Sequence, residues 1–250
     1  MRCWRPFSDA AAAAVKAWGP DRIVLLPLYP QYSTTTTASA FKDWERASAK
    51  AGLAAPTSRV CCYPAAAGFV AALAASIGET RAKAKPGLCY RLLLSAHGLP
   101  ERVVARGDPY QWQVEQTAAA LVHTLGIDDL DWTVCYQSRV GPLRWIGPAT
   151  DSEVRRAGAD GVGVIVAPVA FVSEHSETLV ELDLEYAKLA REAGVPDYLR
   201  APTVSVRPQF IDALAGLVID AARSETCVSG GGSRLCPVSF PRCGFEERSR

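Results

Sequence analysis

Apolar runs alternate with helical stretches along this chain of 250 residues. The apolar runs have the composition of strands that are covered on both faces of a sheet, and they span residues 22–28, 90–95, 132–136 and 161–168. The stretches with a helical pattern span residues 8–18, 38–51, 68–82, 110–125, 151–157, 176–193 and 208–223. This alternation predicts an α/β fold with parallel sheets, with a single strand before residue 88.

A row of carboxylates follows the last apolar run. Glu174, Glu177, Glu181 and Glu185 are spaced by three and four residues, which would place them on one helix face. Like charges in such a row repel each other unless cations or protons are shared among them. Together with His175, these oxygen ligands at the carboxyl end of a strand suit a divalent metal that must come and go. The alternative is a solvated acidic helix face.

A histidine marks the end of a second apolar run. Residues 90–94 are followed by Ser95, Ala96 and His97, and then by Gly and Pro, which end the strand. A histidine at the end of a parallel strand faces the crevice in which open α/β sheets bind ligands. The alternative is a structural histidine, which is also our interpretation of His123 within residues 110–125.

Composition and charge narrow the function classes. A hydrophobic content of 49% and a charged content of 21% are those of an ordinary globular protein. The formal net charge of +1 gives no electrostatic reason to expect a nucleic-acid partner. No apolar run reaches the length of a membrane span, and the first residues lack the apolar core of a signal peptide, so we expect a cytoplasmic location.

Six of the eight cysteines fall into two groups, and the other two, Cys61 and Cys62, are adjacent. Cys3, Cys89 and Cys135 lie in or beside strand-like runs, which predicts small buried side chains. Three others near the C-terminal end lie in a Gly- and Pro-rich segment with little core to join, which favours ligands over core residues: Cys227, Cys236 and Cys243.

Five motifs occur in one order along the chain: residues 28–33 before a threonine run, 95–97, 106–110, 136–142 and 171–186. Over about residues 1–223 the chain resembles the ferrochelatases, enzymes that insert ferrous iron into protoporphyrin IX to form haem. The resemblance implies two Rossmann-like chelatase domains with parallel sheets, a porphyrin cleft between them, and no bound nucleotide.

The same resemblance implies a division of the chain. Residues 1–66 would be the remainder of an N-terminal half-domain, residues 67–225 a C-terminal half-domain whose last helix packs back on the first, and residues 226–250 a cysteine-containing tail. The family's first strand–helix–strand portion is absent. We therefore expect the first domain to be incomplete and its sheet to be open, because parallel strands need neighbours.

The resemblance also assigns a metal site and a relay. It implies that His97 and Glu177 are the paired residues that meet the iron, and that Glu174, His175 and Glu181 form an acidic relay. Neutral imidazole can accept a proton near neutral pH, and carboxylates can pass protons and metal along. The residues expected to bind the porphyrin are Arg2, Tyr32, Tyr136, Gln137, Ser138, Arg139, Trp145 and Phe171.

Some members of the family bind a [2Fe–2S] cluster through C-terminal cysteines, and residues 236–243 resemble that tail. A cluster needs four ligands. Cys227, Cys236 and Cys243 would provide three, and Cys61 or Cys62 the fourth; the alternative is that these thiols bind nothing.

Two other functions remain compatible with the sequence. One is a chelatase for another tetrapyrrole, such as coproporphyrin with iron or sirohydrochlorin with cobalt. The other is a truncated, non-catalytic remnant that binds porphyrin or haem. Peripheral membrane contact is a further possibility implied by the family, and the oligomeric state is left open.

Overall fold

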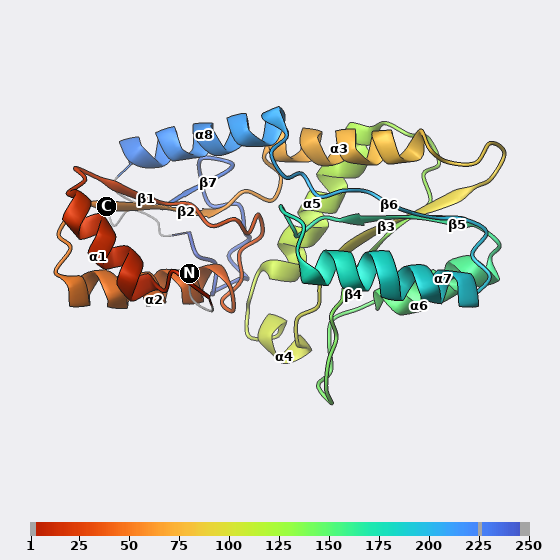
Figure 1. Ribbon diagram of the computed structural model, residues 1–250, viewed down its shortest axis with the longest axis horizontal. Helices are drawn as coiled ribbons and strands as arrows, with labels where there is room; N and C mark the ends of the chain where they lie inside the picture. Colours follow the sequence, from red (N-terminus) through yellow and green to blue (C-terminus); the bar gives the residue numbers. More distant parts are fainter. Residues whose placement is uncertain (1–3, 225–226, 246–250) are drawn as a thin grey trace. The chain divides into compact units, whose positions relative to one another are not determined.

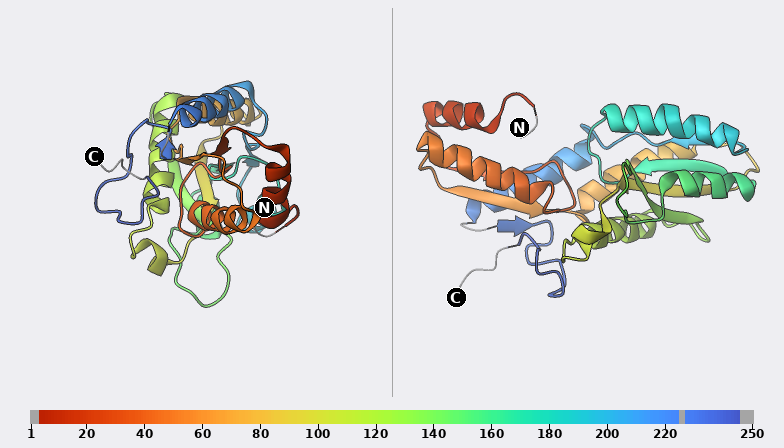
Figure 2. Two further views of the ribbon diagram at one scale, coloured as in Figure 1. Left: turned by 90° about the vertical axis from the view of Figure 1, so that its left-hand side faces the viewer. Right: turned by 90° about the horizontal axis from the view of Figure 1, so that it is seen from below.

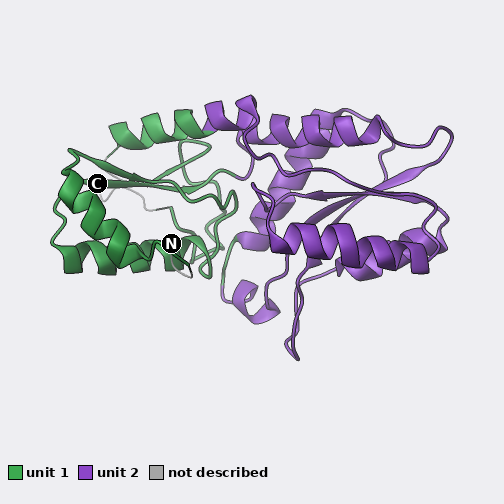
Figure 3. Ribbon diagram, in the orientation of Figure 1, with its two compact units in different colours: residues 1–63, 107–109, 214–250 green, residues 64–106, 110–213 purple. Residues whose placement is uncertain are grey.

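The computed structural model describes residues 4–224 and 227–245. The chain forms two compact units, shown in different colours in Figure 3. Unit 1 comprises residues 1–63, 107–109 and 214–250, and unit 2 comprises residues 64–106 and 110–213. The domain boundaries expected from the sequence, at residues 66 and 225, stay a prediction.

Unit 1 contains a parallel three-stranded sheet in the order β1-β2-β7. Its strands are β1 (Ile23–Leu25), β2 (Thr57–Cys62) and β7 (Cys227–Ser229). Helices α1 (Ser8–Trp18) and α2 (Thr37–Ala51) lie side by side in this unit (Figure 2). Arg46 of α2 joins them by an ion pair with Asp9 of α1, at 2.9 Å.

Two strands of unit 1 were not expected from the sequence. The prediction of a single strand before residue 88 is wrong, because β2 also precedes that residue. β2 begins with three polar residues and so lacks the apolar run of a covered strand. One of them, Ser58, is nevertheless buried, and its hydroxyl donates to the Ser224 carbonyl over 2.9 Å. β7 lies in the Gly-rich tail and pairs with β2, Cys227 opposite Arg59.

Unit 2 contains a parallel four-stranded sheet in the order β4-β3-β5-β6. Its strands are β3 (Tyr90–His97), β4 (Trp132–Gln137), β5 (Gly163–Pro168) and β6 (Tyr198–Arg200). The first three confirm the strands expected from apolar runs. β6 was missed, because it has only three half-buried residues.

The helices of unit 2 form layers on its sheet. They are α3 (Ala67–Arg81), α4 (Glu101–Val104), α5 (Tyr110–Leu125), α6 (Thr150–Ala159), η1 (Glu177–Glu185) and α7 (Tyr186–Glu192). Figure 1 shows α3 on one face of the sheet and α6 and α7 on the other. A last helix, α8 (Pro208–Arg223), begins in unit 2 and ends in unit 1. No helix among the described residues is long and apolar enough to span a membrane.

The helix expected over residues 176–193 consists of two parts. η1 is a π-helix, in which hydrogen bonds join residues five apart, and α7 continues it as an α-helix. The sequence pattern indicated a helix but not its pitch. π-helical turns are rare and are often found at functional sites.

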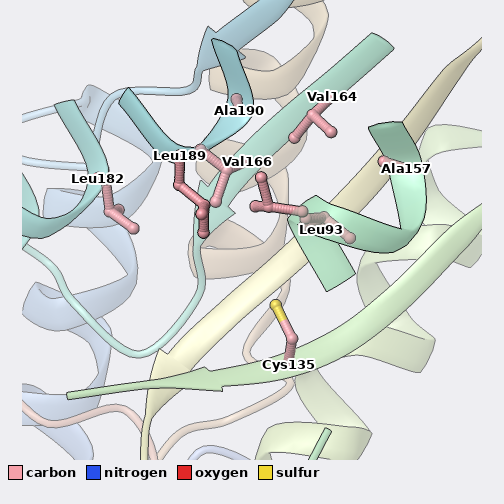
Figure 4. Packing of buried hydrophobic residues seen from close by; sticks show 9 residues of the cluster. Leu93, Cys135, Ala157, Val164, Val166, Leu182, Leu189 and Ala190 are labelled. Carbon is pink, nitrogen blue, oxygen red and sulfur yellow. The ribbon is translucent and has the colours of Figure 1, made fainter. Parts of the chain in front are cut away.

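The face of the sheet that carries α6 and α7 changes in character along β3. Leu93, Ser95 and His97 alternate with residues of the other face. Leu93 packs with Cys135, Val166 and other buried side chains in the apolar cluster of Figure 4. Towards the carboxyl ends of the strands this cluster gives way to polar side chains, which place the candidate site.

Two helical glycines of unit 2 should respond in opposite ways to alanine. A methyl group on Gly158 of α6 would overlap the carbonyl group of Ala193, whereas one on Gly78 of α3 meets nothing within 4 Å. We expect Gly158→Ala to lower the free energy of unfolding by about 1–3 kcal/mol, and Gly78→Ala to raise it by about 0.5–1 kcal/mol. Urea denaturation followed by circular dichroism measures both, and a stabilising Gly158→Ala would contradict this packing.

Candidate functional site

His97 is the last residue of β3, and its ring has a defined orientation. Its Nδ1 lies 2.7 Å from the carbonyl oxygen of Gly98 and donates to it. In the neutral ring the lone pair is therefore on Nε2. That nitrogen lies 3.8 Å from Oε2 of Glu177, and the two side chains are 41% and 44% exposed. A solvent-accessible basic nitrogen thus faces a carboxylate at the end of the central strand.

Gly98, the residue after His97, is closely packed. A methyl group on Gly98 would lie 2.9 Å from the Gln137 carbonyl oxygen and 3.2 Å from Trp145 Cε3. The Gly98 amide donates to that same oxygen over 2.7 Å, which ties the end of β3 to the end of β4. The missing side chain lets half-buried Trp145 lie against the backbone that carries His97.

The expected row of four carboxylates does not lie on one helix. Glu174 precedes η1, where it pairs with Arg200 at 2.6 Å and accepts the Thr203 amide at 2.9 Å. Burial raises the pKa of Glu174, but the hydrogen bonds from Thr203 and Arg200 outweigh it and the pKa is lowered overall. The placement of Glu174 on the helix face was therefore wrong. Arg200 on β6 is the cation that relieves the repulsion, and it also pairs with Asp183 at 2.6 Å.

His175 lies between this carboxylate and the start of η1. Its Nδ1 accepts the backbone amide of Glu177 over 3.2 Å, which leaves Nε2 as the protonated nitrogen of the neutral ring. The ring packs against Phe171, with centroids 4.8 Å apart and planes tilted by 56°. Both rings are only half-buried, so they form part of the surface near Glu177.

Glu181 is held by neutral donors. The hydroxyl of Ser138 donates to its two carboxylate oxygens at 2.7 and 2.8 Å, and the side-chain amide of Gln137 donates over 3.0 Å. Ser138 has a φ of 58°, a left-handed conformation that is uncommon for residues other than glycine. The sequence predicted that Gln137 and Ser138 bind porphyrin. In this structure both side chains donate hydrogen bonds to Glu181.

The other residues expected to bind porphyrin are placed differently. Trp145 and Phe171 are half-buried and Arg139 is exposed, all in unit 2. Tyr136, by contrast, is only 1% exposed, and burial raises the pKa of its hydroxyl. Its side chain lies inside the protein. Tyr32 is buried in unit 1, and Arg2 lies outside the described residues.

Four cysteines among the described residues of unit 1 lie around Tyr32: Cys61, Cys62, Cys227 and Cys243. Cys61 and Cys62 have sulfur atoms 3.3 Å apart, and they pack with Cys227 and the Tyr32 ring. Hydrogen bonds with Cys227 and Cys62, together with burial, raise the pKa of the Cys61 thiol. A hydrogen bond from Cys236 lowers the pKa of Cys243 to about 6. Within residues 4–224 and 227–245, however, no three His, Cys, Asp or Glu side chains are arranged to hold a metal ion.

The remaining cysteines give a mixed outcome. Cys135 is buried, which confirms the expectation from the sequence. Cys89 is exposed, so the prediction of a buried side chain there was wrong; it lies before β3, where the chain has not yet entered the sheet. Cys3 lies outside the described residues.

Sequence reasoning missed the role of Asp108. This buried carboxylate accepts hydrogen bonds from the Ser33 hydroxyl at 2.9 Å and from the Thr34 hydroxyl and amide at 2.6 and 2.7 Å. Two of the motifs, residues 28–33 with the following threonines and residues 106–110, therefore meet in unit 1. Their order along the chain was visible in the sequence, but their contact was not.

A family model described as Ferrochelatase matches residues 1–222. The chain belongs to the ferrochelatase family. It is 54% identical over 243 residues to a ferrochelatase of Phenylobacterium zucineum, covering 97% of this chain and 69% of the relative. It is 50% identical over 248 residues to a ferrochelatase of Caulobacter vibrioides, covering 99% of this chain and 70% of the relative. Ferrochelatases are enzymes, lyases of haem biosynthesis that insert iron into a porphyrin.

Solved structures agree with this assignment at the level of the fold. SirB from Bacillus subtilis, determined with Fe3+, superposes with a TM-score of 0.61 at 15% identity, covering 89% of this chain and 78% of SirB. DR2241 from Deinococcus radiodurans, a multi-domain protein with structural similarity to chelatases, gives 0.53 at 14% identity, covering 82% and 42%. The expected α/β chelatase fold with parallel sheets is confirmed.

Proposed function

We propose that this ferrochelatase-family protein inserts ferrous iron into protoporphyrin IX to form haem. The observation that carries the proposal is the pairing of His97 Nε2 with Glu177 Oε2 at 3.8 Å, both accessible at the carboxyl end of β3. Ligands of open α/β sheets bind at that end of the strands. Iron enters here as a substrate, so a site made of few side chains suits it.

The proposed roles follow from the state of each side chain. His97 Nε2 carries the lone pair, so it accepts one of the two pyrrole protons that leave as the porphyrin is metallated, and the carboxylate relay takes up the other. Glu177 stabilises the resulting imidazolium and meets the incoming iron. Glu181 is held in place by donors, while Glu174 is paired with Arg200; the two carboxylates and His175 form the relay.

We propose that the porphyrin binds on the surface around His97 and Glu177. Phe171 and Trp145 provide half-buried aromatic surface in unit 2, and Arg139 is an exposed cation for the propionate groups. Aromatic side chains next to the reacting atoms can hold the macrocycle in a distorted shape that exposes the nitrogen lone pairs. Cytoplasmic location and peripheral membrane contact stay predictions.

Substrate preference is the direct test of this proposal. The purified protein would be mixed anaerobically with Fe2+ and either protoporphyrin IX or coproporphyrin III, and haem formation followed by absorbance. We expect faster insertion into protoporphyrin IX. Faster insertion into coproporphyrin would reassign the substrate. Tight binding of either porphyrin without any insertion would support the alternative, a non-catalytic binding protein.

We further propose that Cys227, Cys236 and Cys243, with Cys61 or Cys62 as the fourth ligand, bind a [2Fe–2S] cluster. Thiolates are the usual ligands of such clusters. The positions of these thiols support the proposal. Cys61, Cys62 and Cys227 pack together as one group, and Cys236 forms a hydrogen bond with Cys243 in a second group. Both groups of thiols lie beside Tyr32. In the described residues no three of these side chains are arranged around a common metal position. Binding would draw the two groups of thiols together.

Removal of one thiol tests the cluster. Protein purified without oxygen should be reddish-brown and contain iron and acid-labile sulfide in equal amounts, and Cys236→Ser should lose both. Cys89→Ser is the matched control and should keep the colour, because Cys89 is exposed in unit 2. A colourless, sulfide-free wild-type preparation with an intact circular dichroism spectrum would exclude the cluster.

A further inference from the structure

Buried polar side chains of unit 2 lead from the interior of the sheet to Glu181. Ser95 on β3, Gln137 at the end of β4 and Thr150 at the start of α6 are all completely buried. The Ser95 hydroxyl donates to Gln137 Oε1 over 2.8 Å, and Gln137 Nε2 donates to Glu181 Oε2 over 3.0 Å. Ser95 Oγ also lies 3.2 Å from Thr150 Oγ1. These contacts form one continuous chain of hydrogen bonds.

This series of hydrogen bonds has a direction. A hydroxyl has a single proton, and that of Ser95 goes to Gln137, so Thr150 donates to Ser95. The carbonyl end of the Gln137 amide then faces Ser95 and its NH2 group faces the carboxylate. A reversed amide would turn its oxygen towards Glu181 and leave two acceptors without a proton between them. Glu181 is therefore the terminal acceptor.

A buried series of hydrogen bonds stabilises the fold only when every donor and acceptor in it is paired. Burying a hydroxyl or an amide costs free energy unless its hydrogen bonds are made. Leu93, two residues before Ser95 on the same face of β3, belongs to the apolar cluster, and Ser95 replaces apolar packing by directed bonds. The series of hydrogen bonds also ends close to the reacting groups, because Gln137 is the register partner of His97 across β3 and β4.

We propose that Ser95, supported by Thr150, is a positioning residue for iron insertion. Through the Gln137 amide it orients the Glu181 carboxylate at the strand ends that carry His97. The inference rests on the relay role proposed for Glu181 and goes beyond it by identifying the groups that hold this carboxylate. Gln137 thereby has a role in orientation rather than in contact with the porphyrin.

Loss of the Ser95 hydroxyl should affect turnover and not substrate binding. We expect Ser95→Ala to lower kcat for iron insertion by about 10-fold, the usual size of such supporting interactions, with an unchanged KM for porphyrin. Thr150→Val should lower kcat in the same direction, and Thr150→Ser, which keeps the hydroxyl, should remain near wild type. In a Glu181→Gln background Ser95→Ala should cause no further loss, because the carboxylate that it positions is gone.

A second measurement needs no turnover. The side-chain NH2 of Gln137, observed by NMR in the protein without iron or porphyrin, should lose protection from hydrogen exchange in Ser95→Ala and Thr150→Val but not in Thr150→Ser. Unchanged exchange in Ser95→Ala would overturn the inference, as would an equal fall in kcat with and without Glu181. A Glu181→Gln variant that inserts iron at the wild-type rate would instead overturn the relay role itself, and the inference with it.

Discussion

His97→Ala should reduce iron insertion by a factor of about 10²–10⁴, the range typical of removing a general acid or base. The variant loses the Nε2 lone pair that faces Glu177. It should nevertheless fold, because the side chain is 41% exposed and its hydrogen bond to the neighbouring Gly98 carbonyl is local. Initial rates of haem formation at saturating porphyrin would measure the loss.

His123→Ala is the matched control for this variant. His123 is exposed on α5 and takes part in none of the contacts around the site. Its replacement should leave both the rate and the thermal unfolding midpoint near those of the wild type. The proposed role of His97 would be refuted by an alanine variant that forms haem at a rate comparable to the His123→Ala protein.

Glu177→Gln should cause the second-largest loss, of about 10²-fold or more in kcat. The amide keeps the shape of the side chain but removes the charge that stabilises a protonated His97 ring 3.8 Å away. It also removes a charged oxygen that can meet ferrous iron. Because the side chain is 44% exposed, the free energy of unfolding should hardly change.

Glu185→Gln provides the comparison for Glu177→Gln. Glu185 is the last residue of η1 and is exposed. It carries the same charge, so its replacement changes the net charge of the protein equally. Kinetics of the two variants side by side separate a specific carboxylate from a general loss of negative charge, and equal losses of kcat would point to the latter.

The carboxylates of residues 174–181 show why partners matter more than spacing. Glu174 is paired with a guanidinium, Glu181 receives neutral donors, and Glu177 faces a histidine. A row of like charges would destabilise a helix. The structure avoids this cost by giving each carboxylate a different partner from a different element, and these partners, Arg200, Gln137 and His97, come from three separate strands.

The sequence alone determined the central part of unit 2. β3 and β5 are covered on both faces and β4 over its second half, so their apolar runs were visible without any neighbour, and His97 followed from the end of such a run. The five motifs also identified the family. Short strands with mixed polarity, β2, β6 and β7, depend on pairing that no local pattern reports.

The tertiary structure decided the rest of the candidate site. The pairing of Glu174 with Arg200 and the burial of Tyr136 both depend on residues far away in the chain. The same holds for the line of donors from Thr150 to Glu181. Periodicity along a sequence reports which side of an element is apolar, whereas the partner of a buried polar group is chosen by whatever the fold brings within hydrogen-bonding distance.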